Sequence, residues 1–534
     1  MIRLKTTTAS LRDNQEINYR KQIPDTDMSP GNEYASSVRP LPFSSMPGPR
    51  GLRKLPYIGT ALLFKPFSRF TPETFGEMVS YMHDKYGCIF KSRLGKDYSV
   101  YTDNLRDIET IFRTEDTYPL RRLMTLSRVF RERNGLPHAL GTVSGPEWYE
   151  LRSPLNPLLN RPQVCLHYLP AQNQVADDFV SRLQTNVFSP EQLSEEFFKF
   201  AAESIGIVCY NRRLGFLEPV LSAERVQLLE SFKIALHCTF IAMMGLERRY
   251  LKTADDAFYR QYEDAMKFIR NQSMLYVEKV KEELKVRPFG NDKNDTNAGN
   301  KARVESNLLA SMIVNSQLDI EKILAIIDSM LIAGTDSTAR NLAILFYNLA
   351  QNPDVQDIAA KEVTSLIGTQ HSVTPATLAK MNYVKSCVKE SMRLNFPLSN
   401  GTERTLTSDT VLSGYLVPKG TSVIMSSRRM SLDPANFPHP LQFKPERWMR
   451  DGTLGPDETG NSKKGSAFAC LPFGHGARGC IGRRFAELEM YVAAAKVLQK
   501  LQIRVDHSYS GLDSIYTPFI TPKKPIPFIF TERT

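Results

Sequence analysis

The sequence has no uninterrupted run of about 18 apolar residues, the length expected of a membrane-spanning helix. Its most apolar long stretch, 320–350, is interrupted by Asp328, Asp336 and Arg340. An N-terminal secretory signal with a continuous apolar centre is missing as well. We therefore expect neither a transmembrane helix nor export through a secretory signal.

Cysteine is scarce and follows no pairing pattern. The seven cysteines form an odd number and include no Cys-x-x-Cys pair. This argues against a disulfide framework and a zinc-ribbon site, and it fits a reducing compartment. Most of the cysteines are expected to be small buried hydrophobic residues, and Cys480 is the exception.

Charge is only moderately unbalanced. The 534 residues are 42% hydrophobic and 23% charged, which excludes a disordered or fibrous protein. Lys and Arg total 68 and Asp and Glu total 57, so the formal net charge is +11. A basic surface suits nucleic acid, anionic lipid or an acidic protein partner, and composition does not choose among them.

A polar leader precedes the globular part of the chain. Residues 1–46 contain few large apolar residues and no sustained period, so we expect them to be poorly ordered. The first segment, MIRLKTTTASLR, has basic and hydroxyl residues but no acidic residue, which is typical of an organelle transit peptide. A plain disordered tail is the alternative. Pro and Gly residues at 47–51 mark the start of one large domain, 47–534.

Helical spacing dominates this domain. Apolar residues recur at i, i+3 and i+4 over 221–240, 256–284 and 319–352. Strand-like stretches are short and few: 88–90, 98–102, 410–417 and 526–530. The sequence therefore predicts a mainly α fold with a minor β region (α+β) and one long central helix.

The segment around Cys480 is rich in glycine. It reads FGHGARGCIG over 473–482, and an amphipathic helix follows from Arg483. Glycines let the backbone bend tightly and approach a flat ligand. The amides at a helix N-terminus favour a thiolate, so Cys480 is predicted to be a metal ligand or a nucleophile. His475 could serve a nucleophile as base, but the glycines would then have no purpose.

The pattern formed by Phe473, Gly476, Arg478, Cys480 and Gly482 resembles the haem-binding loop of the cytochrome P-450 family. The resemblance extends over roughly 47–534 and implies that family's fold. It also implies a haem b cofactor with the Cys480 thiolate as proximal iron ligand, which pushes electron density toward O–O cleavage.

Two further groups of residues resemble family motifs. Glu390 and Arg393 resemble the Glu-x-x-Arg of the helix behind the haem, and Arg447 resembles the residue that completes this buried triad. The resemblance further implies that four residues meet the haem propionates: Trp148, Arg152, Arg404 and Arg478. For Arg404, a surface role is the alternative.

The long helix contains Gly334, Asp336, Ser337 and Thr338. The resemblance implies that Gly334 allows a local distortion that leaves room for dioxygen, and that Asp336 and the next alcohol deliver protons. The family usually has Thr where this chain has Ser337, so Thr338 is a second candidate. A glycine that serves helix packing alone is the other interpretation.

Basic residues at two places resemble the mitochondrial branch of the family, which docks an acidic [2Fe–2S] ferredoxin. They are Lys385, Lys389, Arg483 and Arg484. Solvated surface charge is the alternative. The apolar segment 240–246 with basic residues after it resembles a membrane-dipping loop, which implies peripheral contact with the matrix side of the inner membrane, or else a buried helix.

The resemblance implies a monooxygenase that inserts one oxygen atom into an apolar substrate, either a sterol, a steroid or a secosteroid. NADPH would supply electrons through ferredoxin reductase and ferredoxin, and no nucleic acid is involved. By position, Ile332, Leu398 and Phe519 are candidates to face the substrate. The alternatives are oxidation of foreign compounds, an isomerase that needs no oxygen, and a non-catalytic haem- or sterol-binding protein.

Overall fold

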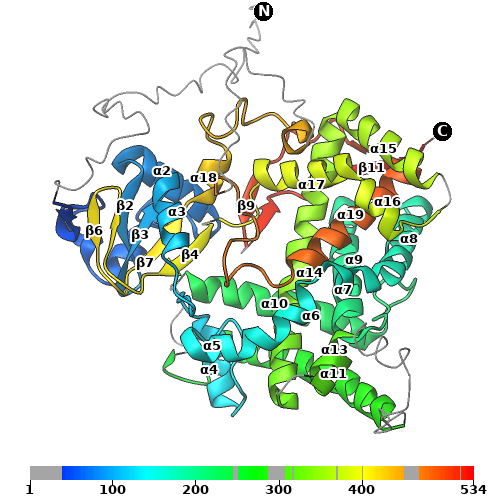
Figure 1. Ribbon diagram of the computed structural model, residues 1–534, viewed down its shortest axis with the longest axis horizontal. Coiled ribbons are helices and arrows are strands. Elements are labelled where there is room, and N and C mark those ends of the chain that lie inside the picture. The colour runs from blue at the N-terminus through cyan, green and yellow to red at the C-terminus, as the bar shows by residue number, and fades with distance from the viewer. Residues whose placement is uncertain are drawn as a thin grey trace, which may run out of the picture.

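The computed structural model describes residues 39–244, 251–286, 307–315, 318–368, 371–399, 401–449, 468–517 and 519–533. Most of the predicted leader and part of the predicted membrane-dipping loop lie outside the described residues. Figure 1 shows a small region of strands at the left and a large region of helices at the right. The predicted mainly α fold with a minor β region is confirmed.

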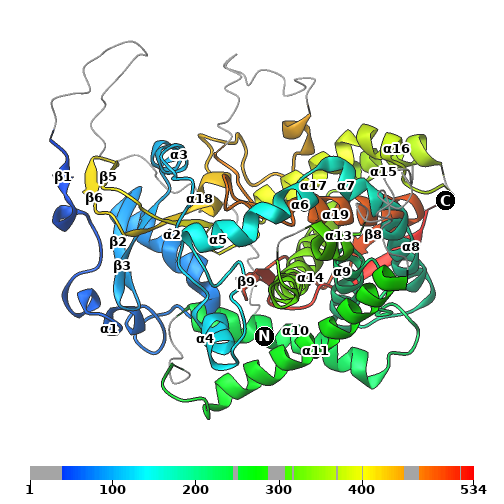
Figure 2. The same ribbon diagram turned by 60° about the horizontal axis from the view of Figure 1, so that its bottom comes forward.

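The helical region is built around α14 (Ile320–Gln351), which begins at Asp319, whose side chain accepts a hydrogen bond from the Lys322 amide. It ends just before Pro353, which has no amide hydrogen to continue the helix. Figure 2 shows α14 in the middle of this region. The helices that pack against it include α9 (Pro190–Tyr210), α11 (Ala257–Val286), α17 (Asn382–Leu394) and α19 (Arg483–Lys500).

The remaining longer helices enclose this centre. They are α2 (Phe75–Tyr86), α3 (Leu105–Arg113), α4 (Thr125–Arg133), α5 (Gly145–Arg152), α8 (Leu169–Thr185), α10 (Ala223–Met243), α13 (Leu308–Asn315) and α15 (Pro353–Ile367). Short helices connect them: α1 (Ile58–Ala61), α6 (Asn156–Leu159), α7 (Pro162–His167), α16 (Pro375–Lys380) and α18 (Ser427–Ser431). Most of these helices bury their apolar faces in one large core, whereas α2 packs in a second cluster, α3 and α18 in a third, and α5 in a fourth.

By length and apolar composition alone, α10 is long enough to cross a membrane, although its sequence contains no uninterrupted run of about 18 apolar residues. Leu229, Phe232 and Cys238 on this helix are buried in the protein core. Core packing accounts for part of its apolar composition, since 44% of the apolar window is buried.

Strands form a four-stranded sheet in the order β2 (Ile89–Leu94), β3 (Asp97–Thr102), β7 (Ser422–Met425) and β4 (Thr402–Thr405). β3 and β7 run parallel, with Ser99 opposite Ser422. A second sheet joins β1 (Leu41–Pro42), β6 (Tyr415–Val417) and β5 (Thr410–Leu412). Two antiparallel pairs complete the set: β8 (Leu501–Val505) with β11 (Phe528–Glu532), and β9 (Ser514–Tyr516) with β10 (Ile520–Pro522).

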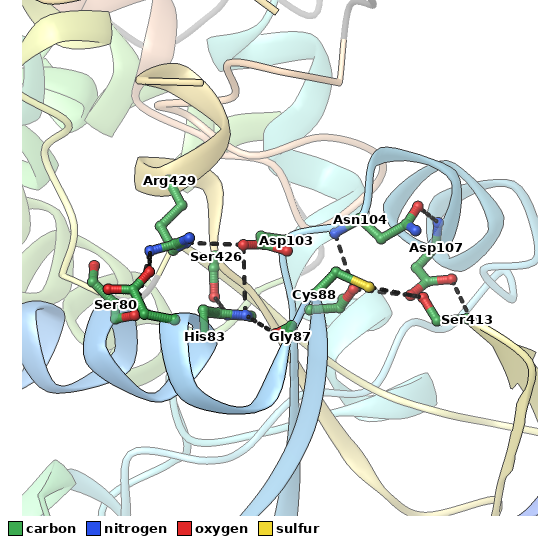
Figure 3. A network of polar contacts seen from close by, with 12 residues as sticks. Ser80, His83, Gly87, Cys88, Asp103, Asn104, Asp107, Ser413, Ser426 and Arg429 are labelled. Atoms are coloured by element: carbon green, nitrogen blue, oxygen red, sulfur yellow. Dashed lines mark hydrogen bonds and ion pairs between the residues drawn. The ribbon is translucent and has the colours of Figure 1, made fainter. Parts of the chain in front are cut away.

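A buried histidine joins α2 to this sheet and to α18 (Figure 3). His83 Nε2 lies 2.9 Å from Ser426 Oγ, and Nδ1 lies 3.0 Å from the Gly87 carbonyl and 3.5 Å from Asp103. Burial lowers the pKa of His83, and the Asp103 charge opposes that shift. Arg429 pairs with Asp103 at 2.9 Å, so the charge of Asp103 beside the histidine is balanced by a cation of the same region.

Candidate functional site

The loop before Cys480 is held in a tight backbone turn. The Cys480 amide donates to the Phe473 carbonyl at 2.8 Å, and the Gly479 amide donates to the Gly476 carbonyl at 3.0 Å. Gly476 has φ +71°, a conformation that favours glycine, and a Cβ there would collide with the Glu115 carboxylate. The glycines are therefore required by the loop's own geometry.

The Cys480 thiol is accessible to solvent but is crowded by protein atoms. This burial raises its pKa. The amides of Gly482 and Arg483 at the start of α19 and the charge of Arg152 oppose that shift. The helix terminus thus acts on the sulfur in the predicted direction, although burial is the larger effect on the pKa of Cys480.

Four arginines gather around Arg478 of this loop: Arg121, Arg152, Arg404 and Arg478 itself. Burial and then the charges of the other three lower the pKa of Arg478 to about 9. The pKa of Arg152 is lowered to about 10, mainly by burial and against the attraction of Cys480. The cluster therefore has more positive charge than its surroundings neutralise.

Each predicted member of this cluster is fixed by hydrogen bonds or stacking. The Arg478 guanidinium lies 4.1 Å from the ring centre of the buried Trp148 and donates to Ser144 Oγ at 2.8 Å. Arg152 donates to the Gly479 carbonyl at 3.0 Å. Arg404 is 4% exposed, donates to the His475 carbonyl at 2.8 Å and pairs with Glu115, so the surface alternative for Arg404 is wrong.

The cluster also has donors that no protein group uses. Within the described ranges, Nη1 of Arg478 and Nε of Arg121 are buried without a hydrogen-bond partner. The sequence analysis missed Arg121, since nothing in the surrounding PLRRL segment distinguishes it from a surface arginine. Donors that are buried and unpaired in a cationic cluster suit the carboxylates of a ligand.

On α14, Ala333 is exposed and Ser337 is half-buried, with Ser337 Oγ donating to the Ala333 carbonyl at 2.6 Å. Asp336 is 4% exposed and accepts from Arg340 Nε at 2.7 Å. Burial raises the pKa of Asp336, and Arg340 opposes the shift. The other oxygen, Oδ2, has no partner among the residues that the structure describes.

Gly334 has a packing role that the structure makes visible. A Cβ at this position would lie 2.9 Å from Cγ1 of Ile205 on α9, so only glycine allows the two helices to come this close. α14 continues through Gly334 without a break. The interpretation of a packing glycine is thereby supported, and the predicted room for dioxygen stays a prediction.

Glu489 on α19 is a buried carboxyl group that the sequence analysis missed. Burial raises its pKa to about 8, and the hydroxyl of Thr338 on α14 opposes that shift. Thr338 is buried too and faces α19, whereas Ser337 is more accessible. The sequence did contain a signal for this burial. Glu489 lies one helical turn after the buried Phe485, so the two side chains lie on the same face of the helix, toward the core.

The structure brings Glu390, Arg393 and Arg447 together as predicted. Glu390 pairs with Arg393 at 2.8 Å and with Arg447 at 3.1 Å, and the first two are fully buried. Trp448 Nε1 also donates to Glu390, at 2.9 Å. Arg447 and Trp448 lie in the 3-10 helix η6 (Pro445–Trp448), which packs against α17.

The four predicted docking residues lie on α17 and α19, which pack against each other. Lys389 and Arg484 are exposed. Arg483 is also exposed but pairs with Glu487 at 2.9 Å. Lys385 is half-buried, and burial lowers its pKa. Among the predicted substrate-facing residues, Leu398 and Phe519 form an antiparallel backbone bridge, while Ile332 lies on α14.

Comparison with known sequences identifies the family. A sequence model of cytochrome P450 matches residues 49–530. The chain belongs to the cytochrome P450 family. Cytochrome P450 27C1 of Danio rerio is 29% identical over 519 residues, which cover 95% of this chain and 90% of the relative.

Two further relatives of this P450 are named as mitochondrial. The sterol 26-hydroxylase of Rattus norvegicus is 27% identical over 518 residues, which cover 94% of this chain and 92% of the relative. The probable cytochrome P450 12d1 distal of Drosophila melanogaster is 28% identical over 487 residues, covering 88% and 89%. The predicted family and its mitochondrial type are confirmed.

Membership of the P450 family makes the protein a monooxygenase with a thiolate-ligated haem, and NADPH supplies its electrons through redox partners. The residues of the site fit this group. Cys480 offers an accessible sulfur beside a glycine-rich loop, and the arginine cluster offers unused donors for the two carboxylates of a haem.

Proposed function

We propose that Cys480 would hold the haem iron through its thiolate in a mitochondrial-type monooxygenase that hydroxylates a sterol, steroid or secosteroid. One observation carries the assignment: the accessible Cys480 thiol lies within electrostatic reach of Arg152, a member of an arginine cluster with unused buried donors. A thiol and a dicarboxylate site side by side are what a thiolate-ligated haem needs.

In this proposal, Trp148 and four arginines hold the haem carboxylates: Arg121, Arg152, Arg404 and Arg478. When bound, the haem iron supplies the redox chemistry that activates dioxygen. The overall reaction consumes the substrate, O₂, two electrons from NADPH and two protons, and it yields the hydroxylated product and water. Asp336 and either Ser337 or Thr338 move the protons toward the reacting oxygen.

The substrate class is proposed from the relatives and from the apolar residues near the site. Sterol 26-hydroxylases are among the similar proteins, although their identity to this chain is 27–28%. Ile332, Leu398 and Phe519 would contact the apolar ring system. Foreign apolar compounds are the second candidate class, because neither the relatives nor these side chains exclude them.

An acidic [2Fe–2S] ferredoxin, reduced by its reductase, is the proposed electron donor. Lys389 and Arg484 are exposed on α17 and α19, the latter being the helix that follows Cys480. Lys385 and Arg483 would contribute less, since one is half-buried and the other pairs with Glu487. Opposite charges across such an interface speed the encounter.

Peripheral contact with the matrix side of the inner mitochondrial membrane is proposed from one apolar face. Leu52, Ile58 and Phe67 are exposed, and basic residues Arg53 and Lys54 lie beside them. This segment meets the end of α10 through one core cluster that contains Phe64 and Met244. Apolar side chains flanked by cations suit an anionic lipid surface.

The decisive test of ligation is the spectrum of the reduced carbon monoxide complex. The parent should show the red-shifted Soret band of thiolate ligation. Cys480→His should lose that band, whereas the control Cys470→Ala, which alters another incompletely exposed cysteine, should keep it. Retention of the thiolate band in Cys480→His would disprove the assignment.

The test of substrate and turnover is a spectral titration with sterols, steroids, secosteroids and foreign compounds, paired with product formation using NADPH, reductase and ferredoxin. Hydroxylated product from a sterol-type compound is the expected result. Binding without product from any compound would favour the non-catalytic binding protein. An isomerised product made without dioxygen would favour the isomerase, which the intact Asp336–Ser337 pair argues against.

A further inference from the structure

The end of α3 brings an acidic side chain to the arginine cluster. α3 ends at Arg113, and Glu115 follows two residues later. The side chain of Glu115 is only 10% exposed, and its carboxylate pairs with Nε of Arg404, whose side chain is 5% exposed. Glu115 therefore places a nearly buried negative charge beside the four arginines.

The last turn of α3 holds the same arginine from a second side. The Arg404 guanidinium lies 5.2 Å from the ring centre of Phe112. The ring of Phe112 also meets the ring of His475 edge to face, with 5.2 Å between their centres. Since Arg404 donates to the His475 carbonyl as well, Phe112 and Glu115 together hold Arg404 against the Cys480 loop.

The two oxygens of Glu115 have different neighbours. Oε1 accepts the hydrogen bond from Arg404, and Oε2 fills the space beside Gly476 where a Cβ would collide with it. The negative charge also acts on Arg478, whose pKa is lowered first by burial and then by the other arginines, and Glu115 opposes this shift. One carboxylate thus contacts the loop, orients one arginine and stabilises the charge of another.

A second acid near the cluster has other partners. Glu403 attracts Arg121, but it pairs with Arg122 at 3.4 Å and accepts a hydrogen bond from Ser422. Its side chain is also more exposed than that of Glu115. In the described part of the chain, the cluster forms its ion pair with Glu115. Removal of the Glu115 charge would therefore leave four buried cations without a paired anion.

We propose that Glu115 is a positioning residue of the haem site, which holds Arg404 against the Cys480 loop and lowers the reduction potential of the bound iron. The inference rests on the proposed function, in which the arginine cluster holds the haem carboxylates. A nearby negative charge favours the oxidised iron, because oxidised iron carries one more positive charge than reduced iron. Salt screens a nearly buried charge only weakly, so the effect should persist at high ionic strength.

Glu115→Gln separates the charge of this side chain from its geometry. The amide has nearly the same size as the carboxylate and keeps an oxygen that can accept from Arg404, but it carries no charge. Asp116→Asn is the matched control, because Asp116 is exposed and lines the same small cavity of about 20 Å³ as Glu115 and Arg404. Both variants remove one negative charge from the same short segment, and only one of these charges is nearly buried.

Redox titration of the haem-loaded, substrate-free protein measures the effect of the charge. Glu115→Gln should shift the midpoint potential of the iron in the positive direction, and the shift should keep its size at high salt. Asp116→Asn should give a smaller shift that disappears at high salt. The spectrum of oxidised Glu115→Gln and its carbon monoxide band should match those of the parent, which excludes altered ligation as the cause of the shift.

Haem transfer to an excess of apomyoglobin measures the positioning. Glu115→Ala removes the contacts with Arg404 and the loop as well as the charge, so it should lose haem several-fold faster than Glu115→Gln. Equal rates of transfer in these two variants would overturn the positioning role, as would loss of haem from Glu115→Gln during purification.

The potentials decide the electrostatic role. A midpoint potential of Glu115→Gln equal to that of the parent, or a shift that disappears at high salt as in Asp116→Asn, would overturn it. A parent without the thiolate band would instead refute the proposed function. The difference in potential between parent and Glu115→Gln would then still test the charge of Glu115, whichever ligand holds the iron.

Discussion

The cluster around Glu390 and the cluster of four arginines near the Cys480 loop differ in how many of their charged groups have partners within the protein. Glu390 accepts hydrogen bonds or ion pairs from Arg393, Arg447 and Trp448, and also from the Lys444 amide at 3.0 Å. The arginine cluster of Arg121, Arg152, Arg404 and Arg478 pairs with few acids and keeps unused donors within the described chain.

The difference separates a structural cluster from a binding cluster. Burying an unpaired charge costs several kcal/mol, so a chain tolerates an excess of buried cations mainly where a ligand supplies the anions. The Glu390 cluster completes its own pairing and joins α17 to η6. Removing one charge should therefore have opposite effects in the two places.

The largest effect on the free energy of unfolding is expected at the Glu390 cluster, whose charges are paired within the protein. Arg393→Ala leaves Glu390 buried without its closest cation, which should cost about 3–5 kcal/mol in the free energy of unfolding. Denaturant unfolding with and without haem would measure this cost. A loss of similar size in both forms is expected, and a loss confined to the haem-loaded form would show that the cluster acts through the cofactor.

A buried acid without a cation should make stability depend on pH. The pKa of Glu489 is about 8 in the folded protein, above the ordinary value of 4.5, so the folded state holds its proton more tightly. The contribution of this group is complete below about pH 4.5 and is lost as pH rises toward about 8, at up to ~1.4 kcal/mol per pH unit. Glu489→Gln should remove that slope. Parallel stability curves for parent and variant between pH 5 and 8 would contradict the shift.

At the arginine cluster, which keeps unused donors, removal of a charge should raise the stability of the haem-free protein instead of lowering it. Arg121→Met removes a cation that burial and then the charge of Arg404 destabilise, so the haem-free protein should gain on the order of 1 kcal/mol. The same variant should lose haem faster, because a donor for its carboxylates is gone. The neighbouring Arg122, which donates to Ser99 at 2.9 Å and pairs with Glu403, is the control, and Arg122→Met should lose stability instead. If haem-free Arg121→Met is less stable than the haem-free parent, the distinction between a structural cluster and a binding cluster is wrong.

Exposed charges should matter least for stability. Lys389→Gln with Arg484→Gln should change the free energy of unfolding by less than about 0.5 kcal/mol. Reduction by ferredoxin should nevertheless slow, and its dependence on salt should flatten. The control changes two exposed or partly exposed lysines of α11, Lys281 and Lys285, to Gln. Equal reduction rates in the two double variants would rule out docking at α17 and α19.

The sequence by itself determined the helical class, the long helix from about 319 to 352, fewer than half of the described strands and the family. These depend on local properties: helical spacing, the Asp319 cap, the stop before Pro353, and residue types at fixed positions around Cys480. The triad of Glu390, Arg393 and Arg447 was also predictable, because its members lie in recognisable motifs.

Only the tertiary structure decided which charges lack partners. Arg121 and Glu489 look like ordinary polar residues in the sequence, and they become significant because distant segments of the chain bury each of them. The contact of Gly334 with Ile205 likewise depends on how two helices cross. The raised pKa of Cys480 also depends on the tertiary structure, because the atoms that bury a thiol come from many parts of the chain and no local sequence pattern predicts them.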